Sequence, residues 1–425
     1  MMKTKNRVIL HIDMNAFYCS VHEAVEPEKY KGKSIAVAGS EELRKGVIVT
    51  SSYTARANGV KTGMLVSQGR KLDPNLIIIP PNFDLYRHYS REFMKIVYQF
   101  SPMIEEASID ECYLDISGSS QFGHPLEIAE KIQQQIKDQL GLPCSIGIGP
   151  NKLLAKMGSD MKKPNGITIL RKREFPKLFW SKPTNALFGI GKRSAERLEK
   201  LGIKTIGELA QADEERLKKE FGILGAHLKN SANGVDHSPV VVETEANKSI
   251  GHTTTLPKDI RNLKEAYSVF LGLADQVTRR MRKQQLLSST IQITIRYSDR
   301  KTITRSITIE QPTEEMNTVY KVACQLFDQF WNSEPVRLLG ITLQNLRIKE
   351  ETGIQLDIFN YQEQPKKESL NKIMDQLRDK YGENTIITAG MKGIESGERL
   401  RNTKARGTSL QKDYLKLNPI QKKDN

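Results

Sequence analysis

Residues 104–116, Ile-Glu-Glu-Ala-Ser-Ile-Asp-Glu-Cys-Tyr-Leu-Asp-Ile, constrain the fold more than any other stretch of the chain. Two short runs of β-branched or aromatic residues flank an acidic break, which predicts a β-hairpin with Asp110 and Glu111 at or beside its turn. Two adjacent carboxylates repel each other, and a cation or a proton relieves that repulsion. Taken alone, the pair is equally consistent with a hairpin turn whose acids are solvated.

A third carboxylate favours the cation. Residues 8–18, Val-Ile-Leu-His-Ile-Asp-Met-Asn-Ala-Phe-Tyr, begin as a strand that runs into Asp13 and then turn helical. If that strand lies beside the hairpin, Asp13, Asp110 and Glu111 converge at one edge of a sheet. Three carboxylates with room for waters and phosphate oxygens suit Mg²⁺ or Mn²⁺. Such a site can hold two ions and support an in-line phosphoryl displacement.

Length and charge limit the remaining possibilities. A chain of 425 residues is expected to form about three domains. Its 65 Lys and Arg outnumber its 50 Asp and Glu, and the net charge of +15 favours a polyanionic partner such as nucleic acid. The four cysteines are widely spaced and predict reduced thiols in a cytoplasmic protein. No run of 18 apolar residues and no signal peptide are present, so we expect a soluble protein without a membrane partner.

The first part of the chain has the order of a split βαβ fold. The pattern predicts strand 7–13, helix 83–100, the hairpin 104–116, helix 125–140 and strand 143–149. This β-α-β-β-α-β order forms an antiparallel sheet backed by two helices. Residues 17–82 are then an insertion large enough to form a small lobe.

Several polar residues near this sheet suit a triphosphate. Tyr53 and Arg56 lie three apart on an expected first helical turn after the strand that ends at Thr50, and together present a hydroxyl and a fork-shaped cation. An ordinary surface contact between the two is the alternative. The turn Lys163-Pro164-Asn165-Gly166 fixes the direction of its lysine, and Lys163 could reach a triphosphate.

Residues 173–240 are helical with short loops. The turn Gly189-Ile190-Gly191-Lys192 precedes a helix and exposes backbone N–H groups where a DNA phosphate can bind without reference to sequence. An ordinary helical hairpin is the alternative.

The β-α-β-β-α-β order then returns. We expect strand 249–256, helix 262–286, strands 288–298 and 301–309, helix 313–332 and strand 336–346. Eight Lys or Arg and one acid fall between Val277 and Arg305, and we interpret this run as a basic sheet face that binds a phosphate backbone. Solvated surface charge is the alternative. The candidate DNA contacts here are Arg296, Arg300, Lys301 and Arg305.

Beyond residue 348 the chain is polar. The apolar pentapeptide Gln355-Leu356-Asp357-Ile358-Phe359 has the character of a linear docking peptide, and a small strand on the preceding domain is the alternative. Residues 366–425 contain one helical patch, with Ile373, Leu377 and Tyr381, and a basic end that we expect to be disordered.

Four segments carry a resemblance to a known family. They are Asp13-Met14-Asn15-Ala16-Phe17-Tyr18, Ser51-Ser52-Tyr53-Thr54-Ala55-Arg56, Ser108-Ile109-Asp110-Glu111-Cys112-Tyr113 and Lys163-Pro164-Asn165-Gly166. Their order and spacing resemble the Y-family translesion DNA polymerases, and the bacterial DNA polymerase IV group most closely. The resemblance covers about residues 5–348 and extends to the tail.

The resemblance implies an α+β, multidomain right-hand polymerase. It places a ferredoxin-like palm in residues 1–16 and 83–172, small fingers in 17–82 and a helical thumb with a helix-hairpin-helix in 173–240. A linker at 241–247 leads to a C-terminal β-α-β-β-α-β little finger in 248–348. The tail, 349–425, carries a clamp-binding peptide at 355–359.

The resemblance also implies roles for matching residues. Asp13, Asp110 and Glu111 are expected to bind two Mg²⁺ with the Met14 carbonyl as an added ligand, and Mn²⁺ as a substitute. The triphosphate is expected on Tyr53, Arg56 and Lys163, with Thr50 a weaker candidate. Tyr18 falls at the steric gate that excludes a ribose 2′-OH. Gln355, Leu356, Ile358 and Phe359 match the sliding-clamp peptide. Asn15 departs from members that carry Asp there.

These expectations describe a monomeric, low-fidelity polymerase without proofreading that uses primer-template DNA, deoxynucleoside triphosphates and a sliding clamp in DNA damage tolerance. Two other functions fit part of the pattern. A nucleotidyl cyclase could use the same sheet and paired acids but has no duplex to hold. A non-catalytic, clamp-tethered DNA-binding protein would not need three carboxylates.

Overall fold

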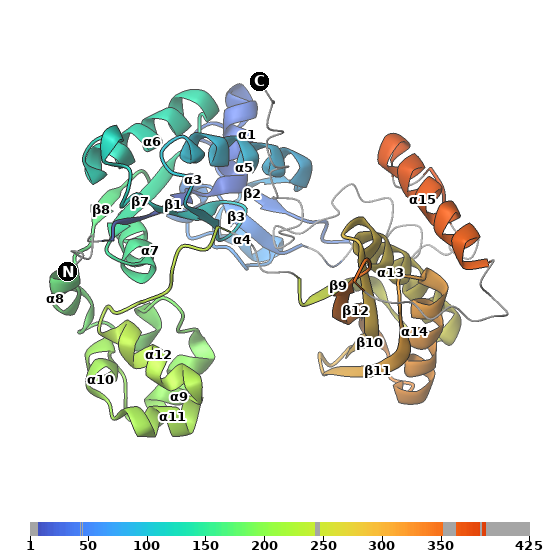
Figure 1. Cartoon of the computed structure of the whole chain (residues 1–425). Helices are drawn as coiled ribbons and strands as arrows, with labels where there is room; N and C mark the ends of the chain where they lie inside the picture. Colours follow the sequence, from blue (N-terminus) through green and yellow to red (C-terminus); the bar gives the residue numbers. More distant parts are fainter. Residues whose placement is uncertain are drawn as a thin grey trace. The chain divides into compact units, whose positions relative to one another are not determined.

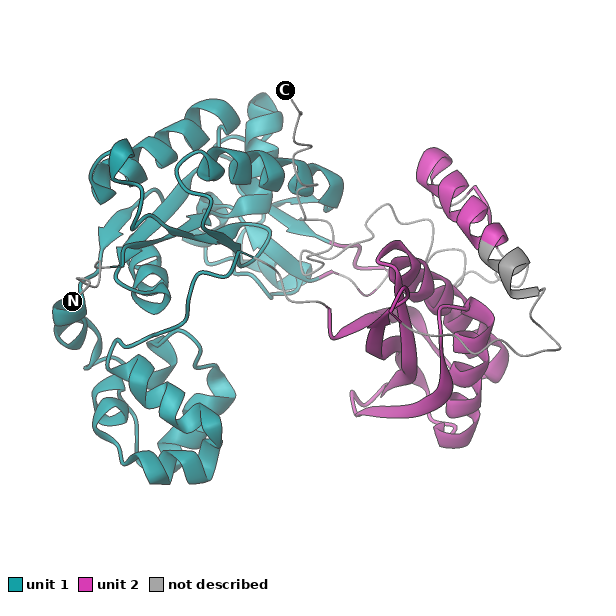
Figure 2. Ribbon diagram, in the orientation of Figure 1, with its two compact units in different colours: residues 1–38, 47–244, 407–425 teal, residues 39–46, 245–406 magenta. Residues whose placement is uncertain are grey.

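The computed structural model describes residues 7–42, 44, 46–242, 247–351, 363–382 and 385–387. Residues 363–368 are described by their backbone only. The chain divides into two compact units, coloured separately in Figure 2. The first contains residues 1–38, 47–244 and 407–425, and the second contains 39–46 and 245–406. The four-part division into palm, fingers, thumb and little finger remains a prediction.

The first unit is built on a five-stranded sheet in the order β5-β6-β1-β7-β8. Only β7 and β8 pair in parallel. The bounds are β1 Ile9–Met14, α5 Phe83–Tyr98, β5 Ile104–Glu106, β6 Glu111–Asp115, α6 Pro125–Leu140, β7 Cys144–Gly149, α7 Lys152–Met161 and β8 Ile167–Ile169. From β1 to β7 this is the predicted β-α-β-β-α-β order, and the α+β, ferredoxin-like fold is confirmed.

The two faces of this sheet are covered by different helices. Leu10 and Ile12 on β1 belong to the main core, which also contains apolar residues of α5 and α6. Helix α7 lies across the other face, as Figure 1 shows, and contacts β1 and β7. Alternate β1 residues point to opposite faces of the sheet, so His11 and Asp13 face α7.

Close packing holds α7 against the sheet. A Cβ at Gly147 on β7 would lie 1.9 Å from the Ala155 carbonyl oxygen, so only glycine permits this approach. At the start of the helix, the Asn151 side chain accepts the Leu154 N–H at 2.8 Å and acts as the N-cap. Side chains on the sheet side of α7 are therefore held at fixed positions above the end of β1.

Two smaller groups of elements complete the first unit. One contains a sheet in the order β3-β2-β4 with its own small core. The second is helical and packs around its own core. The bounds are α1 Phe17–Val25, α2 Pro27–Tyr30, β2 Ile35–Ala38, β3 Ile48–Ser51, α3 Tyr53–Ala57, α4 Val66–Leu72, β4 Ile77–Ile79, α8 Phe175–Phe179, α9 Lys192–Lys200, α10 Ile206–Gln211, α11 Glu214–Phe221 and α12 Ile223–Ala232.

The second unit is an antiparallel sheet in the order β11-β10-β12-β9 with α13 and α14 packed on one face. The bounds are β9 Ser249–Ile260, α13 Leu263–Lys283, β10 Leu286–Tyr297, β11 Thr302–Thr313, α14 Met316–Phe330 and β12 Val336–Ile348. This is the predicted second β-α-β-β-α-β order, and the C-terminal domain of this type is confirmed.

The predicted basic sheet face in this unit is wrong. Arg279, Arg280, Arg282 and Lys283 lie on α13 rather than on the sheet. Arg305 shares its face of β11 with Ile303 and Ile307, which pack against the helix-covered core, and its guanidinium lies over the Phe330 ring of α14. The basic residues of this run lie on one helix, two strands and the turn between the strands, so they do not form one surface.

The face of the sheet opposite α13 and α14 is rich in neutral hydrogen-bonding groups instead. On β10 and β11 it carries Thr290, Gln292, Thr294, Thr302, Thr304, Ser306 and Thr308. Arg296 adds a cation to this face, and its Nε donates to Thr302 Oγ1 at 2.8 Å.

Helix α15, Glu363–Tyr381, covers the predicted helical patch of the tail and binds α13 through ion pairs. The Arg378 guanidinium is 3.0 Å from Asp275 Oδ1, and both side chains are buried. Arg282 on α13 pairs with Asp375 at 2.8 Å. The docking peptide, residues 355–359, lies outside the described residues.

Candidate active site

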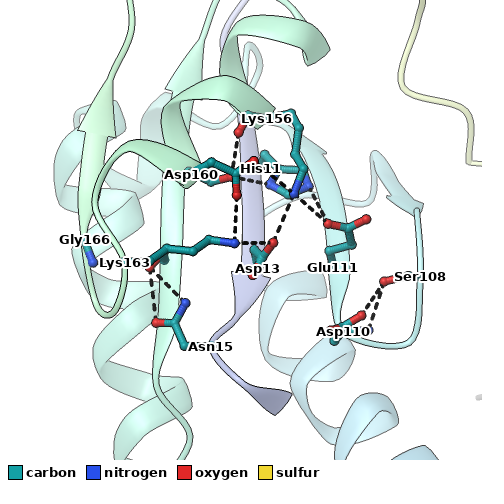
Figure 3. A network of polar contacts seen from close by, with 12 residues as sticks. His11, Asp13, Asn15, Ser108, Asp110, Glu111, Lys156, Asp160, Lys163 and Gly166 are labelled. Atoms are coloured by element: carbon teal, nitrogen blue, oxygen red, sulfur yellow. Dashed lines mark hydrogen bonds and ion pairs between the residues drawn. The ribbon is translucent and has the colours of Figure 1, made fainter. Parts of the chain in front are cut away.

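The site begins with two acids that face each other across paired strands. In the register of β1 and β6, Asp13 lies directly opposite Glu111. Directly opposed residues project from the same face of a sheet, which here is the face that lies under α7. Figure 3 shows the two carboxylates approaching one another there.

The Lys156 ammonium lies between these carboxylates. Its Nζ is 3.1 Å from Asp13 Oδ2 and 3.0 Å from Glu111 Oε2. Burial alone would lower the pKa of Lys156, but Asp13 and Glu111 outweigh that effect and raise it. The lysine is therefore charged and partly neutralises both acids.

His11 lies behind Glu111 on the same face. Its Nε2 is 3.4 Å from Glu111 Oε2, a long contact without hydrogen-bond alignment, and its Nδ1 is 2.9 Å from Ser159 Oγ. Burial lowers the pKa of His11. Burial would raise the pKa of Glu111, but His11 and Lys156 together lower it to about 2. Glu111 is thus ionised at neutral pH and available as a ligand.

Asp110 lies next to this pair but points elsewhere. Its backbone carbonyl accepts the Met14 N–H at 2.9 Å, which joins the end of β1 to the hairpin. Its carboxylate accepts a 2.5 Å hydrogen bond from Ser108 Oγ, and Figure 3 shows it directed toward Ser108. Burial raises the pKa of Asp110, and the nearby Asp13 and Glu111 add to that rise. The three predicted acids thus lie at one edge of the sheet, but only Asp13 and Glu111 contact the same cation, the Lys156 ammonium.

The Lys163 turn joins the same edge. Lys163 Nζ is 2.8 Å from Asp13 Oδ2 and 2.8 Å from Asp160 Oδ1. The buried Asn15 side chain accepts the Asn165 N–H at 2.8 Å. Asn15 therefore connects the segment that carries Asp13 to the turn that carries Lys163.

The predicted triphosphate residues of the insertion lie on β3 and α3. The Arg56 guanidinium lies 4.9 Å from the centroid of the Tyr53 ring, so the two side chains do project together. The Tyr53 hydroxyl is buried and makes no hydrogen bond to a described residue. Thr50 is the second-to-last residue of β3, and its backbone carbonyl accepts a hydrogen bond from the Cys19 thiol at 3.4 Å. A buried hydroxyl without a partner is available to a ligand.

Tyr18 lies in the first turn of α1, directly after the strand that carries Asp13 and Met14. Its ring stacks on Tyr86 with a centroid distance of 4.2 Å and meets the Phe83 ring edge-on. These contacts hold the Tyr18 ring in one orientation. Met14 is buried at the end of β1.

The predicted DNA contacts are distributed over both units. In the first unit, Gly191 is the N-cap of α9, Gly189 has a positive φ of 91°, and Lys192 has 91% of its side chain exposed. In the second unit, Arg300 and Lys301 lie in the turn between β10 and β11, with Arg296 before it and Arg305 after it.

The sequence reasoning missed two residues of the site, His11 and Lys156. The alternation of β1 carried a usable signal for His11, because residues two apart on a strand share a face. For Lys156 the signal was weaker. Lys156, Asp160 and Lys163 are spaced at four and three residues, which places them on one side of α7 and its end.

Known protein families and individual relatives match most of the chain. The impB/mucB/samB family matches residues 12–160, its C-terminal domain matches 247–358, and the DNA polymerase-iota thumb domain matches 185–236. DNA polymerase IV 1 of Bacillus subtilis is 46% identical, with 97% of this chain and 99% of the relative covered. DNA polymerase IV of Oceanobacillus iheyensis is 48% identical, with 97% of each chain covered. The chain belongs to the Y family of DNA polymerases.

A solved Y-family structure has the same fold. The Y-family DNA polymerase chimera Dbh-Dpo4(243-245)-Dbh matches with a TM-score of 0.72 at 27% identity, and covers 80% of this chain and 99% of its own. The predicted translesion DNA polymerase function is confirmed at this level, within the DNA polymerase IV group. Matches over the thumb and the C-terminal domain are not expected of a nucleotidyl cyclase.

The donor set of this Y-family polymerase fits a divalent cation. Ligand atoms of His11, Asp13 and Glu111 all lie within 4.8 Å of one another. Two of these residues supply carboxylate oxygens, which already converge on one cation, the Lys156 ammonium. Among the described residues, no helix is long and apolar enough to span a membrane.

Proposed function

We propose that Asp13, Asp110 and Glu111 hold two Mg²⁺ ions, for which Mn²⁺ can substitute, and that the protein adds deoxynucleotides to a primer 3′ end. The observation that carries the proposal is the register pair of Asp13 and Glu111 with Asp110 beside it. The bound ions would supply charge stabilisation at the attacking and leaving oxygens. Met14 would contribute its carbonyl oxygen as a further ligand.

The cations near the acids would bind the incoming triphosphate. Lys163 and Arg56 supply positive charge, and the buried Tyr53 hydroxyl, which makes no hydrogen bond to a described residue, supplies a hydrogen bond. Thr50 is a weaker candidate on the neighbouring strand. Tyr18, fixed by its stack on Tyr86, would exclude a ribose 2′-OH.

The DNA would contact both units mainly through its phosphates. The backbone at Gly189 and Gly191, with the Lys192 ammonium, offers an anion site at the start of α9. On the second unit, Arg296, Arg300 and Lys301 supply cations, and the hydroxyl-rich face of the sheet supplies neutral donors. Arg305 is left out of this set, because its guanidinium lies over Phe330 on the helix-covered side. Such contacts bind a duplex without reading its sequence, as replication across damage requires.

Three further features belong to the same proposal. The peptide Gln355, Leu356, Ile358 and Phe359 would bind a sliding clamp. The enzyme would act as a monomer in the cytoplasm. The small lobe around β2 to β4 would leave the nascent base pair loosely enclosed, which would give low fidelity without proofreading.

Primer extension by single-site variants tests the metal-ligand assignment. We expect Asp110→Ala and Glu111→Ala to lower the rate about a thousandfold or more, since metal stabilisation of the transition state is worth several kcal/mol. Asp115→Asn is the matched control, because Asp115 shares the strand and face of Glu111 at the far end of β6. Near wild-type rates in the two Ala variants would contradict the proposal, and a cyclic nucleotide made without DNA would favour the cyclase.

A further inference from the structure

The Lys156 ammonium contacts the same two oxygens that would share a divalent ion. Its side chain is 11% exposed, so water screens these contacts only weakly. Without a cation, Asp13 and Glu111 would repel each other across the strands at this depth. Lys156 removes much of that repulsion when no metal is bound.

The position of this ammonium is set by a helix that packs tightly on the sheet. The close approach of Gly147 to Ala155 and the Asn151 cap both fix the backbone of α7. Lys156 therefore changes its contacts by rotation about its four-carbon side chain rather than by movement of the helix.

One turn later, Asp160 offers a second acceptor to the same ammonium. Its Oδ2 is 3.6 Å from Lys156 Nζ, and 48% of its side chain is exposed. Its other oxygen, Oδ1, pairs with Lys163. A side-chain rotation can thus transfer the Lys156 ammonium from Asp13 and Glu111 to a more exposed carboxylate.

We propose that Lys156 is an internal counter-cation that takes the place of a metal ion between Asp13 and Glu111, and that divalent-ion binding displaces it toward Asp160. This inference rests on the proposed function, because it takes Asp13 and Glu111 as metal ligands. An incoming ion must then compete with a tethered ammonium, so the protein without nucleotide binds divalent ions weakly. The acids stay partly neutralised between rounds of synthesis.

Mn²⁺ binding to the full-length protein, without DNA or nucleotide, tests this displacement. The electron paramagnetic resonance signal of free Mn²⁺ gives the dissociation constant. We expect Lys156→Met to bind Mn²⁺ about tenfold or more tightly than wild type, since one close positive charge is removed. Lys152→Met is the matched control, because Lys152 lies one turn earlier on α7 and pairs with Glu105 at 2.6 Å. It should change the constant by less than about twofold.

Two outcomes of this titration would overturn the inference. One is an unchanged or weaker affinity in Lys156→Met, and the other is an equal gain in Lys152→Met. The Asp13→Asn variant separates this failure from failure of the proposed function. Loss of Mn²⁺ binding in Asp13→Asn would support Asp13 as a metal ligand even if the Lys156 inference fails. Wild-type affinity in Asp13→Asn would contradict the proposed function itself.

Lysine acylation of the wild-type protein tests the same displacement without a variant that could fail to fold. Mass spectrometry measures the acylation rate of each lysine in EDTA and in saturating Mn²⁺. We expect Mn²⁺ to speed acylation of Lys156 several-fold, because its ammonium moves to the exposed Asp160, and to leave Lys152 unchanged. Equal rates at Lys156 under the two conditions would overturn the inference.

Discussion

Single hydrogen bonds at the end of β1 hold the site together. The Asn15 side chain donates to Ser145 Oγ at 3.0 Å and accepts the Asn165 N–H at 2.8 Å, and it is buried. A buried amide with both groups paired resists displacement, because breaking either hydrogen bond leaves an unsatisfied polar group. The acid Asp13 and the cation Lys163 are thereby held at a fixed separation.

At the same scale, Tyr18 should determine the choice of sugar. We expect Tyr18→Ala to reduce discrimination against ribonucleotides by about 10- to 100-fold, because the ring that would clash with the 2′-OH is removed. Tyr18→Phe should keep the discrimination, since the ring and its stack on Tyr86 remain. The ratio of kcat/KM for a deoxynucleotide and its ribonucleotide measures the effect. Tyr98→Ala, at an exposed position on α5, is the control, and unchanged discrimination in Tyr18→Ala would place the gate elsewhere.

The sequence was informative about single residues where chain position determines contact. Asp13 lies near the end of β1 and Glu111 begins β6, so their opposition follows from strand pairing, whereas the Asp110 carboxylate turns to Ser108. Lys156 was different, because a lysine on a helix is normally solvated, and nothing in its neighbours shows that this face of α7 lies on two acids. Its role depends on the packing of α7 against β7.

At the scale of elements, capping and breaking residues predicted where a helix begins and ends, but a count of charged residues did not predict which surface those residues share. Helix α6 has the predicted bounds because Pro125 starts it and Gly141, with a φ of 67°, ends it. The basic run 277–305 was misassigned because a charge count ignores which side of an element a residue occupies. Four of its eight basic residues lie on α13, where Arg279 and Arg282 meet acids of α15.

The buried pair of Arg378 and Asp275 should hold α15 on α13. We expect Arg378→Met to lower the free energy of unfolding of the second unit by about 3 kcal/mol, because it removes one partner of a buried ion pair. Trp331 fluorescence during urea denaturation, in a Trp180→Phe background, reports this unit. Lys380→Met is the control on an exposed part of the same helix. Equal stability of the two variants would show that the pair does not anchor α15.

For the whole molecule, the net charge of +15 should appear as salt-dependent DNA binding. We expect Lys192→Ala to reduce the slope of log affinity against log salt by about 1, because one phosphate contact is lost. Fluorescence anisotropy with primer-template DNA over a range of NaCl concentrations measures the slope. Lys29→Ala is the control, since Lys29 pairs with Glu26 on a different group of elements. An unchanged slope in Lys192→Ala would remove the start of α9 from the DNA contacts.

The central claim is that Asp13 and the adjacent pair Asp110 and Glu111, about a hundred residues further along the chain, hold the ions that drive nucleotide transfer. The most direct test counts bound Mn²⁺ in a stalled complex of enzyme, template, dideoxy-terminated primer and the matching deoxynucleotide. We predict two ions per wild-type complex and fewer in Asp13→Asn, Asp110→Asn and Glu111→Gln. Two ions retained in all three variants, with the complex still formed, would contradict the account.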